Sequence, residues 1–339
     1  MTPTENVITA RELSKSFKSR HGAVEAVRSV SIDVRQGEIF GFLGPNGAGK
    51  TTILRMLTTL LPIGAGSATV AGFDVAREPK KVRARIGYVS QLGGADELAS
   101  GRENLILQGR LYGARQAPVV PRVDALVELL DLGGFADRRV KTYSGGQRRR
   151  LDMALGVVHE PAVLFLDEPT TGLDPRSRAS LWNCVRDLRD GGATVFLTTH
   201  YLEEADVLCD RLMIIDQGQV VAVGTPRDLK REVLGDAVAI TLRQDGHEAE
   251  RAVAVLGQQP YVRELVTDGT KVRLYVDDAD LVVPQLIRLL DKEGIGVRSM
   301  TLSEPSLDDV FLRKTGRSLD DAAAGSDHGI SPAQGTETR

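Results

Sequence analysis

Two short segments of this 339-residue chain carry residue types suited to phosphate chemistry. The first, Gly44-Pro45-Asn46-Gly47-Ala48-Gly49-Lys50-Thr51, matches the complete phosphate-binding loop pattern and stands between an expected strand and an expected helix. Its glycines let successive backbone N–H groups point into one concavity, where the helix N-terminus also attracts phosphate. Lys50 would add a mobile positive charge, and the Thr51 hydroxyl would bind Mg²⁺. We expect nucleotide contacts from Gly44, Pro45, Asn46, Gly47, Ala48, Gly49, Lys50, Thr51 and Thr52.

The second segment, Val163-Leu164-Phe165-Leu166-Asp167-Glu168-Pro169, is an apolar strand that ends in two adjacent carboxylates. Adjacent residues on a strand point to opposite sides, so the two acids can have different roles. We expect Asp167 to hold Mg²⁺, usually through water, and Glu168 to polarise the attacking water as general base. A solvated strand end is the alternative interpretation, and the phosphate loop at Lys50 argues against it. Together the two segments predict a nucleoside triphosphatase.

A third segment, Tyr143-Ser144-Gly145-Gly146-Gln147, directly precedes a helical stretch and distinguishes between classes of such enzymes. Ser144 and the two glycines expose N–H groups at a helix N-terminus, which makes a second phosphate-binding surface. Here the sequence resembles the ABC ATPase family, whose signature is Leu-Ser-Gly-Gly-Gln. The resemblance implies head-to-tail dimers, in which the signature of one subunit covers the γ-phosphate held by the loop of the other. Without its neighbours, Ser144 would be interpreted only as a helix N-cap. Tyr143 departs from the usual Leu, a change that should leave the backbone anion site intact.

The resemblance extends from about Val7 to Val223 through the other family motifs. It implies that Phe17 stacks on adenine, although a buried strand phenylalanine is an alternative. It implies that the loop glutamine Gln91 senses Mg²⁺ and water, that Leu173-Asp174 crosses the dimer interface, and that His200 contacts the γ-phosphate. The catalytic set is then Glu168, His200 and Gln91; further nucleotide contacts come from Phe17, Ser144, Gly145, Gly146, Gln147 and Asp174; and the metal set is Thr51, Gln91 and Asp167.

Three further segments resemble the daunorubicin-resistance type of ATP-binding subunit, found in bacterial drug and polyketide exporters. They are Gly101-Arg102-Glu103-Asn104-Leu105, the TTGLDP segment and Glu304-Pro305-Ser306-Leu307-Asp308-Asp309-Val310-Phe311. This resemblance implies an ATPase that uses ATP and Mg²⁺ to export a hydrophobic compound through separate transmembrane permease subunits. A second ATP-binding subunit is also implied, and the complete motifs permit a homodimer.

Strand and helix patterns predict an α/β phosphate-loop core with a mixed sheet, a helical insertion and a small α+β C-terminal domain. We expect a helix from Lys50 to about Leu61, a helix from Pro175 that stops at Gly191-Gly192, and a closing hairpin near Gly224. The expected domains are residues 1–230, with the insertion at about 92–160, and residues 235–315. The polar segment 316–339 is expected to be disordered.

The composition of the chain excludes some classes of partner and some locations. A formal charge of −3 gives no global basic field, so we expect no nucleic-acid partner. The two cysteines, Cys184 and Cys209, are too few for a disulfide framework. We expect no signal peptide, and apolar runs such as Ala162 to Leu166 are too short to span a membrane. The expected location is peripheral, at the cytoplasmic face of the cell membrane.

Two rival functions fit the sequence less well. A soluble ABC protein that acts on ribosomes or DNA usually carries two cassettes or a long coiled coil, and the sequence has neither. A degenerate cassette that binds ATP without cleaving it is disfavoured because Glu168 and His200 are both present.

Overall fold

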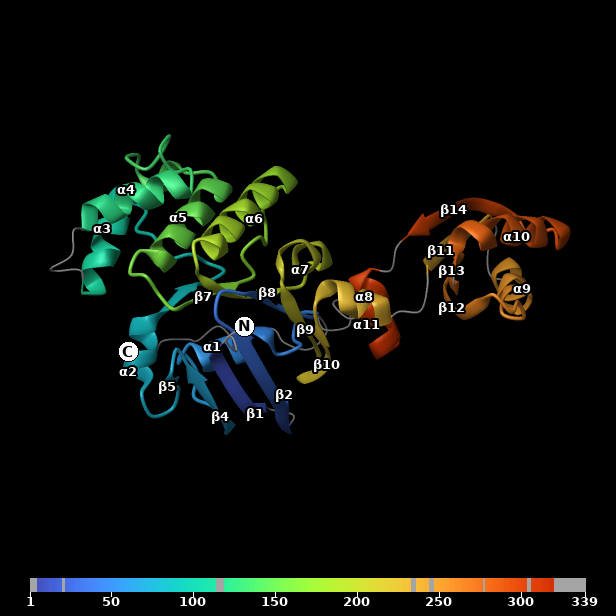
Figure 1. The fold of residues 1–339 in the computed structure, drawn as a ribbon, viewed down its shortest axis with the longest axis horizontal. Helices are drawn as coiled ribbons and strands as arrows, with labels where there is room; N and C mark the ends of the chain where they lie inside the picture. Colours follow the sequence, from blue (N-terminus) through green and yellow to red (C-terminus); the bar gives the residue numbers. More distant parts are fainter. Residues whose placement is uncertain are drawn as a thin grey trace, which may run out of the picture. The chain divides into compact units, whose positions relative to one another are not determined.

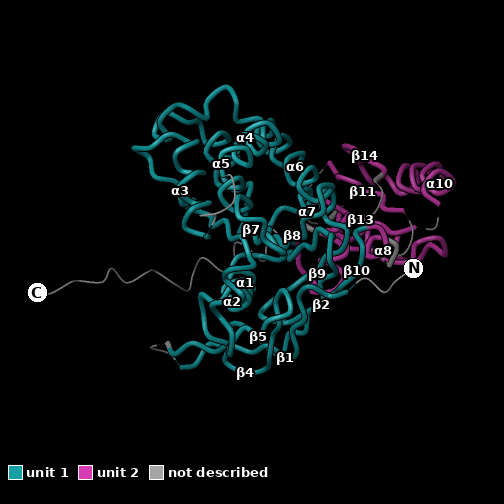
Figure 2. Tube along the Cα trace, turned by 60° about the vertical axis from the view of Figure 1, so that its left-hand side comes forward, with its two compact units in different colours: residues 1–226, 319–339 teal, residues 227–318 magenta. Residues whose placement is uncertain are grey.

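The computed structural model describes residues 5–19, 22–113, 119–232, 236–243, 247–276, 278–303 and 306–319. The described chain divides into two compact units, one reaching to Pro226 and the other spanning Arg227–Ser318, as Figures 1 and 2 show. Each unit has its own sheet and core. The expected tail lies outside the described residues from position 320 onward, as do Glu304 and Pro305.

A six-stranded sheet forms the centre of the first unit, with the strand order β10-β9-β3-β8-β7-β6. Neighbouring strands are parallel except for the β9–β10 hairpin, so the predicted mixed sheet is confirmed. Strands β3, β7 and β8 are buried along their whole length, as expected for parallel strands covered on both faces. The strand bounds are β3 Ile39–Leu43, β6 Ile86–Val89, β7 Val163–Asp167, β8 Thr194–Thr199, β9 Arg211–Asp216 and β10 Gln219–Gly224.

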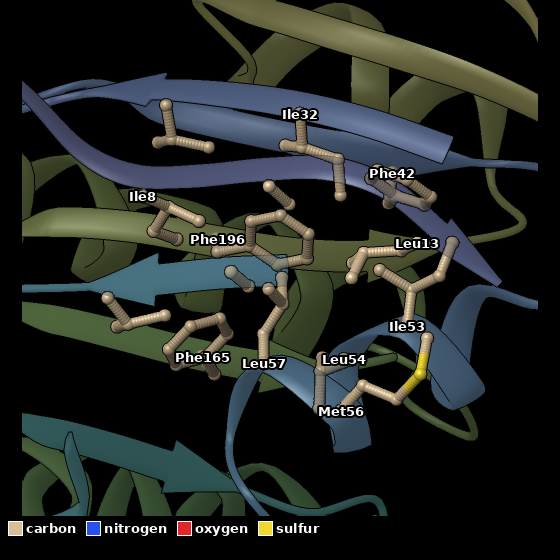
Figure 3. Packing of buried hydrophobic residues seen from close by; sticks show 14 of the residues in the cluster. Ile8, Leu13, Ile32, Phe42, Ile53, Leu54, Met56, Leu57, Phe165 and Phe196 are labelled. Atoms are coloured by element: carbon tan, nitrogen blue, oxygen red, sulfur yellow. The ribbon is translucent and has the colours of Figure 1, made fainter. Parts of the chain in front are cut away.

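A second, antiparallel sheet packs over this one in the order β2-β1-β4-β5. Its strands are β1 Asn6–Ser19, β2 Gly22–Arg35, β4 Ala65–Val70 and β5 Phe73–Asp74. The main core lies between the two sheets and helix α1 (Lys50–Leu57), as Figure 3 shows. The rings of Phe42 and Phe196 stack there with centroids 5.5 Å apart. This packing holds the ends of β3 and α1, and hence the phosphate loop between them.

Helix α1 ends earlier than the expected Leu61. Thr58 caps it: both its N–H and its hydroxyl donate to the Leu54 carbonyl, at 2.9 Å each. The next residue, Thr59, has φ +64°, which turns the chain out of the helix. The capping threonine and the left-handed turn are local details that apolar periodicity does not report.

The remaining helices of the first unit lie on the outer faces of the sheets and in the insertion. The helices outside the insertion are α2 Pro79–Arg85, α6 Pro175–Asp190 and α7 Leu202–Leu208. The insertion contains α3 Gly101–Leu111, α4 Val119–Leu129, the 3₁₀ turn η1 Val140–Thr142 and α5 Gly145–Val157. Both views place α3 and α4 at one end of the unit and β4 and β5 at the other. Helix α6 buries Leu181, Val185 and Leu188 and meets its C-cap at Gly191, as the sequence predicted.

The second unit is an α+β domain whose antiparallel sheet has the order β12-β13-β11-β14. Its elements, with α8 at the boundary, are α8 Pro226–Glu232, β11 Asp236–Leu242, α9 His247–Leu256, β12 Val262–Asp268, β13 Lys271–Val276, α10 Ala279–Lys292, β14 Val297–Ser303 and α11 Leu307–Thr315. Leu307, Val310 and Phe311 form a buried face of α11. Buried Asp309 accepts a hydrogen bond from the Tyr275 hydroxyl at 2.8 Å, which ties α11 to β13. None of the helices in the described part of the chain is long and apolar enough to cross a membrane.

Candidate functional site

The loop between β3 and α1 has the backbone shape of an anion site. Gly49 has φ +103°, and a Cβ atom there would lie 2.4 Å from the Ala26 carbonyl oxygen. A Cβ on Gly44 would lie 2.2 Å from the carbonyl oxygen of Ile215, so neither position accepts a side chain. No side chain caps the N-terminus of α1, which leaves its first N–H groups free to meet a phosphate.

A cavity of about 160 Å³ opens at this loop. Glu168, which directly follows β7, also lines it. The cavity is lined by Ala26, Asn46, Gly47, Gly49, Lys50, Thr51, Thr52 and Glu168. Six of these residues belong to the set predicted from the loop pattern or follow it directly, and Glu168 comes from the second predicted segment. The structure therefore brings the two predicted segments together at one cavity.

Lys50 is buried inside the loop, with 5% of its surface exposed. Its Nζ donates hydrogen bonds to the carbonyl oxygens of Gly44 at 2.8 Å and Pro45 at 3.0 Å. The same atom lies 3.5 Å from Oε1 of Glu168. Burial lowers the pKa of Lys50, and the nearby carboxylates of Glu168 and Asp167 oppose that shift. The ammonium group is thus held ready for a phosphate while the two acids compensate its charge.

Two of the three residues expected to bind Mg²⁺, Thr51 and Asp167, lie next to each other. Oδ1 of buried Asp167 accepts a hydrogen bond from the Thr51 hydroxyl at 3.3 Å and another from the Thr198 hydroxyl at 2.7 Å. A hydroxyl and a carboxylate at this spacing fit Mg²⁺, which prefers oxygen ligands and completes its shell with water and substrate phosphates. The described residues contain no group of three or more His, Cys, Asp or Glu side chains that could hold a metal ion.

Glu168 has an unusual backbone conformation, with φ +47°. Its N–H donates to the Thr198 carbonyl at 3.2 Å and to the Thr198 hydroxyl at 3.1 Å. Its Oε2 accepts a hydrogen bond from the Thr171 hydroxyl at 3.3 Å and lies 3.3 Å from Nδ1 of His200, at ion-pair distance but without hydrogen-bond geometry. Asp167 and Glu168 therefore do have separate surroundings: Asp167 faces Thr51, and Glu168 faces His200.

The electrostatic surroundings keep the Glu168 carboxylate ionised. Burial alone would raise its pKa, but the contacts with His200 and Lys50 outweigh burial and lower it. An ionised carboxylate beside a phosphate cavity can accept the proton of an attacking water.

Ser144 lies at the N-cap of α5 and closes a capping box with Gln147. The Gln147 N–H donates to the Ser144 hydroxyl at 3.3 Å, and the Ser144 N–H donates to Oε1 of Gln147 at 3.0 Å. Ser144 and Gly145 are exposed, and neither lines the cavity at Lys50. The N-terminus of α5 and the cavity at Lys50 are thus separate within one chain.

Tyr143, which departs from the family pattern, is anchored in the helical insertion. Its hydroxyl donates to the Phe135 carbonyl at 2.7 Å, and the two rings pack edge to face with centroids 4.9 Å apart. Burial raises the pKa of the Tyr143 hydroxyl. The larger side chain fits beside the insertion without disturbing the N-cap at Ser144.

Three predicted residues lie apart from the Lys50–Glu168 cluster. Phe17 is 41% exposed on β1, which excludes the buried alternative for its ring. Asp174 caps α6 by accepting from the Ser177 N–H at 3.0 Å and its hydroxyl at 2.6 Å. Gln91 is exposed just after β6, and within the described residues its side chain makes no hydrogen bond to Asp167 or Glu168.

Sequence reasoning missed two residues that hold the site together. Thr198 bonds both acids through one buried hydroxyl. The signal was a polar residue in the otherwise apolar strand ATVFLTT, at its C-terminal end. Arg149 is buried behind the acids, and its place among three successive arginines gives no such signal.

A larger cavity of about 470 Å³ lies between β6 and the helical insertion. Polar residues at its wall include Asn104 and Asp152, and apolar residues include Leu107, Leu111 and Tyr112. The last three are also exposed, by 55%, 72% and 44%. The insertion therefore presents apolar side chains beside an open cavity.

Comparisons with known proteins show which proteins this chain resembles. A family model described as "ABC transporter" matches residues 27–171, and one described as the C-terminal domain of DrrA1-3-like ATP-binding proteins matches residues 224–315. The daunorubicin resistance ATP-binding protein DrrA2 of Streptomyces coeruleorubidus is 46% identical over 92% of this chain and 97% of its own length. The doxorubicin resistance ATP-binding protein DrrA of Mycobacterium tuberculosis is 42% identical, with coverage of 87% and 89% respectively.

Solved structures resemble the first unit. An ATP-binding subunit of an ABC transporter has a TM-score of 0.59 and 26% identity, and covers 67% of this chain and 92% of its own. The dimeric ATP-binding cassette MJ0796, bound to ADP and Pi, has a TM-score of 0.59 at 24% identity and covers 64% and 98%. The latter likeness concerns the fold alone.

Proposed function

Because this chain belongs to the ABC transporter ATP-binding proteins, of the daunorubicin-resistance type, and is an ATPase, we propose that it works as a head-to-tail homodimer driving drug export. The exported compound would be a hydrophobic drug, antibiotic or similar molecule, and it would pass through separate permease subunits in the membrane. The protein would then lie peripherally at the cytoplasmic face. The names of the relatives, which refer to daunorubicin and doxorubicin resistance, support the substrate class.

The observation that carries the enzymatic part is the position of Glu168 at the phosphate cavity. Its carboxylate lies 3.5 Å from Nζ of Lys50 and 3.3 Å from Nδ1 of His200. Lys50 and the N–H groups of the loop would bind the β- and γ-phosphates, while Glu168 orients a water and accepts its proton. His200 would contact the γ-phosphate from the end of β8. Mg²⁺, bound with the nucleotide near Thr51 and Asp167, would supply charge neutralisation.

The separation of the two phosphate surfaces supports the dimer. Ser144 and Gly145 are exposed and do not line the cavity at Lys50. A nucleotide on the loop of one copy could therefore meet the signature segment only from a second copy. Because a single chain holds both halves, two identical chains suffice for two complete sites.

The exposed apolar side chains of the insertion support the permease partner. Leu107 and Leu111 stand beside the larger cavity, which also touches Ser90 and Gly93 next to the loop glutamine Gln91. A permease segment seated there would contact the loop that follows β6. Movement of that loop could then be coupled to the nucleotide site.

A reconstituted system tests this proposal. Purified protein should hydrolyse ATP in a Mg²⁺-dependent manner and dimerise when ATP is bound, and the permease in lipid vesicles should raise the rate. Leu111→Cys should cross-link to a permease cysteine. Val220→Cys on β10, which is also exposed, is the matched control and should not cross-link. The native cysteines are both buried and should not form cross-links. Protein that stays monomeric with ATP and cleaves nothing, even with the permease present, contradicts the proposal.

A further inference from the structure

Arg149 lies behind the catalytic acids and joins the ends of two strands. Its guanidinium donates to the carbonyl oxygens of Pro169 at 2.6 Å, Ser90 at 2.6 Å, Asp167 at 3.2 Å and Glu168 at 3.3 Å. Ser90 directly follows β6, and the other three acceptors follow one another at the end of β7. One side chain therefore fixes the β7 end and the start of the Gln91 loop to helix α5.

The burial of the Arg149 charge indicates a role beyond packing. Arg149 is 7% exposed, and its hydrogen bonds go to neutral carbonyls and not to a carboxylate. Burial lowers the pKa of Arg149, while Asp152 and Asp167 oppose that shift, and the guanidinium remains protonated. A buried charge costs free energy that an apolar side chain of similar size would not, so packing alone does not explain it.

The backbone of Glu168 shows what the guanidinium stabilises. A left-handed conformation with φ +47° is unfavourable for a residue with a side chain, and it persists only where the surroundings hold it. The N–H of Glu168 is held by Thr198, and its carbonyl is held by Arg149. This conformation directs the carboxylate toward Lys50 and His200.

We propose that Arg149 is a positioning residue for ATP cleavage, which holds Glu168 in its working conformation and joins it to the helix that begins at Ser144. This inference rests on the proposed role of Glu168 as general base. Arg149 does not line the phosphate cavity, and its hydrogen bonds to the described residues go to the ends of β6 and β7, so it should control the rate of cleavage and not the affinity for nucleotide.

Substitutions on one helix separate these effects. Arg149→Gln removes the charge and most of the N–H donors of the guanidinium group. Arg149→Lys keeps the charge, but a single ammonium group cannot reach all four carbonyl oxygens. Arg150→Gln is the matched control, because Arg150 lies on the same helix and bonds to the carbonyl and carboxylate of Asp131. We expect kcat to fall about 10- to 100-fold in Arg149→Gln and less in Arg149→Lys, with Kd for ADP and KM for ATP changing less than about threefold. Arg150→Gln should keep kcat within about threefold.

The Glu168→Gln background adds a second readout. If Arg149 acts through Glu168, Arg149→Gln should lower the residual turnover of Glu168→Gln by much less than it lowers the wild-type rate. The inference is overturned if kcat is unchanged in Arg149→Gln, or if KM rises by the same factor as kcat falls. It is also overturned if the effects of Arg149→Gln and Glu168→Gln are independent, or if both Arg149 variants lose cooperative unfolding. Wild-type protein without ATPase activity would instead overturn the proposed function.

Discussion

Nζ of Lys50 and Oε1 of Glu168 lie 3.5 Å apart, with only 4% and 13% of their side chains exposed. The group that would bind phosphate and the group that would activate water therefore neutralise each other. An incoming phosphate must compete with the Glu168 carboxylate for Lys50. With these proposed roles, binding of the nucleotide and release of the base would be coupled through one ion pair.

Glu168→Gln should abolish turnover but preserve binding. The amide cannot accept the proton of the attacking water, so kcat should fall by about 10²- to 10⁴-fold, the usual contribution of a general base. Because the substitution also removes the charge that competes for Lys50, Kd for ATP should stay equal or decrease. Turnover assays, equilibrium binding and gel filtration with ATP check this, and a trapped nucleotide-bound dimer is expected. A near-normal ATPase rate would show that the base is misassigned.

Lys50→Ala, in contrast, should weaken the binding of ATP itself. Its ammonium is the cationic member of the cavity lining, so its removal takes away a charge-assisted contact of about 1.5–3 kcal/mol, or roughly a 10- to 100-fold increase in Kd for ATP. Calorimetric titration with ATP and ADP measures this. Lys81→Ala, which loses an exposed ion pair with Glu78 on α2, is a suitable control and should bind normally. Tight ATP binding by Lys50→Ala contradicts the role assigned to the lysine.

The sequence predicted the parts of this site that form within one segment of chain. The loop from Gly44 to Thr51 and the acids after β7 were identified because each has a fixed local pattern, and parallel strands bring such ends to one edge of the sheet. Thr198 and Arg149 were not identified, because their contacts join residues such as Arg149 and Ser90 that are far apart in sequence. Only the folded packing decides which polar side chain lies behind Glu168.

The contacts of Tyr143 could not be predicted from the sequence either, because the family pattern shows only that this residue replaces the usual Leu. The fold shows that its hydroxyl bonds to the Phe135 carbonyl and that its ring packs on Phe135. The N-cap of α5 at Ser144 depends on backbone geometry, so the neighbouring side chain could change without altering it.

Tyr143→Phe should therefore affect stability more than activity. The substitution leaves the Phe135 carbonyl without this partner, at a cost of about 1 kcal/mol, and keeps the ring packing. Thermal or urea unfolding should show the loss, while kcat and KM for ATP should stay within about twofold. Ser144→Ala provides the contrast, because it removes the N-cap hydroxyl itself and should lower activity. A large drop in kcat for Tyr143→Phe would mean that the tyrosine has a direct role at the nucleotide.

His200→Ala should move the acid limb of the ATPase pH profile. In the free protein His200 and Lys50 lower the pKa of Glu168 against the effect of burial, so the carboxylate stays ionised to below the ordinary pH for a glutamic acid. A carboxylate with a depressed pKa also contributes stability that is present above its unfolded-state pKa and is lost as pH falls through the folded-state pKa. Without His200, burial remains and the pKa of Glu168 should rise. The acid limb of kcat/KM should therefore shift to higher pH, on top of any loss of rate from the missing γ-phosphate contact. His159→Ala, which changes a histidine outside the phosphate cavity, should leave the limb in place. An acid limb that is identical in His200→Ala and wild type would show that His200 does not control the ionisation of Glu168.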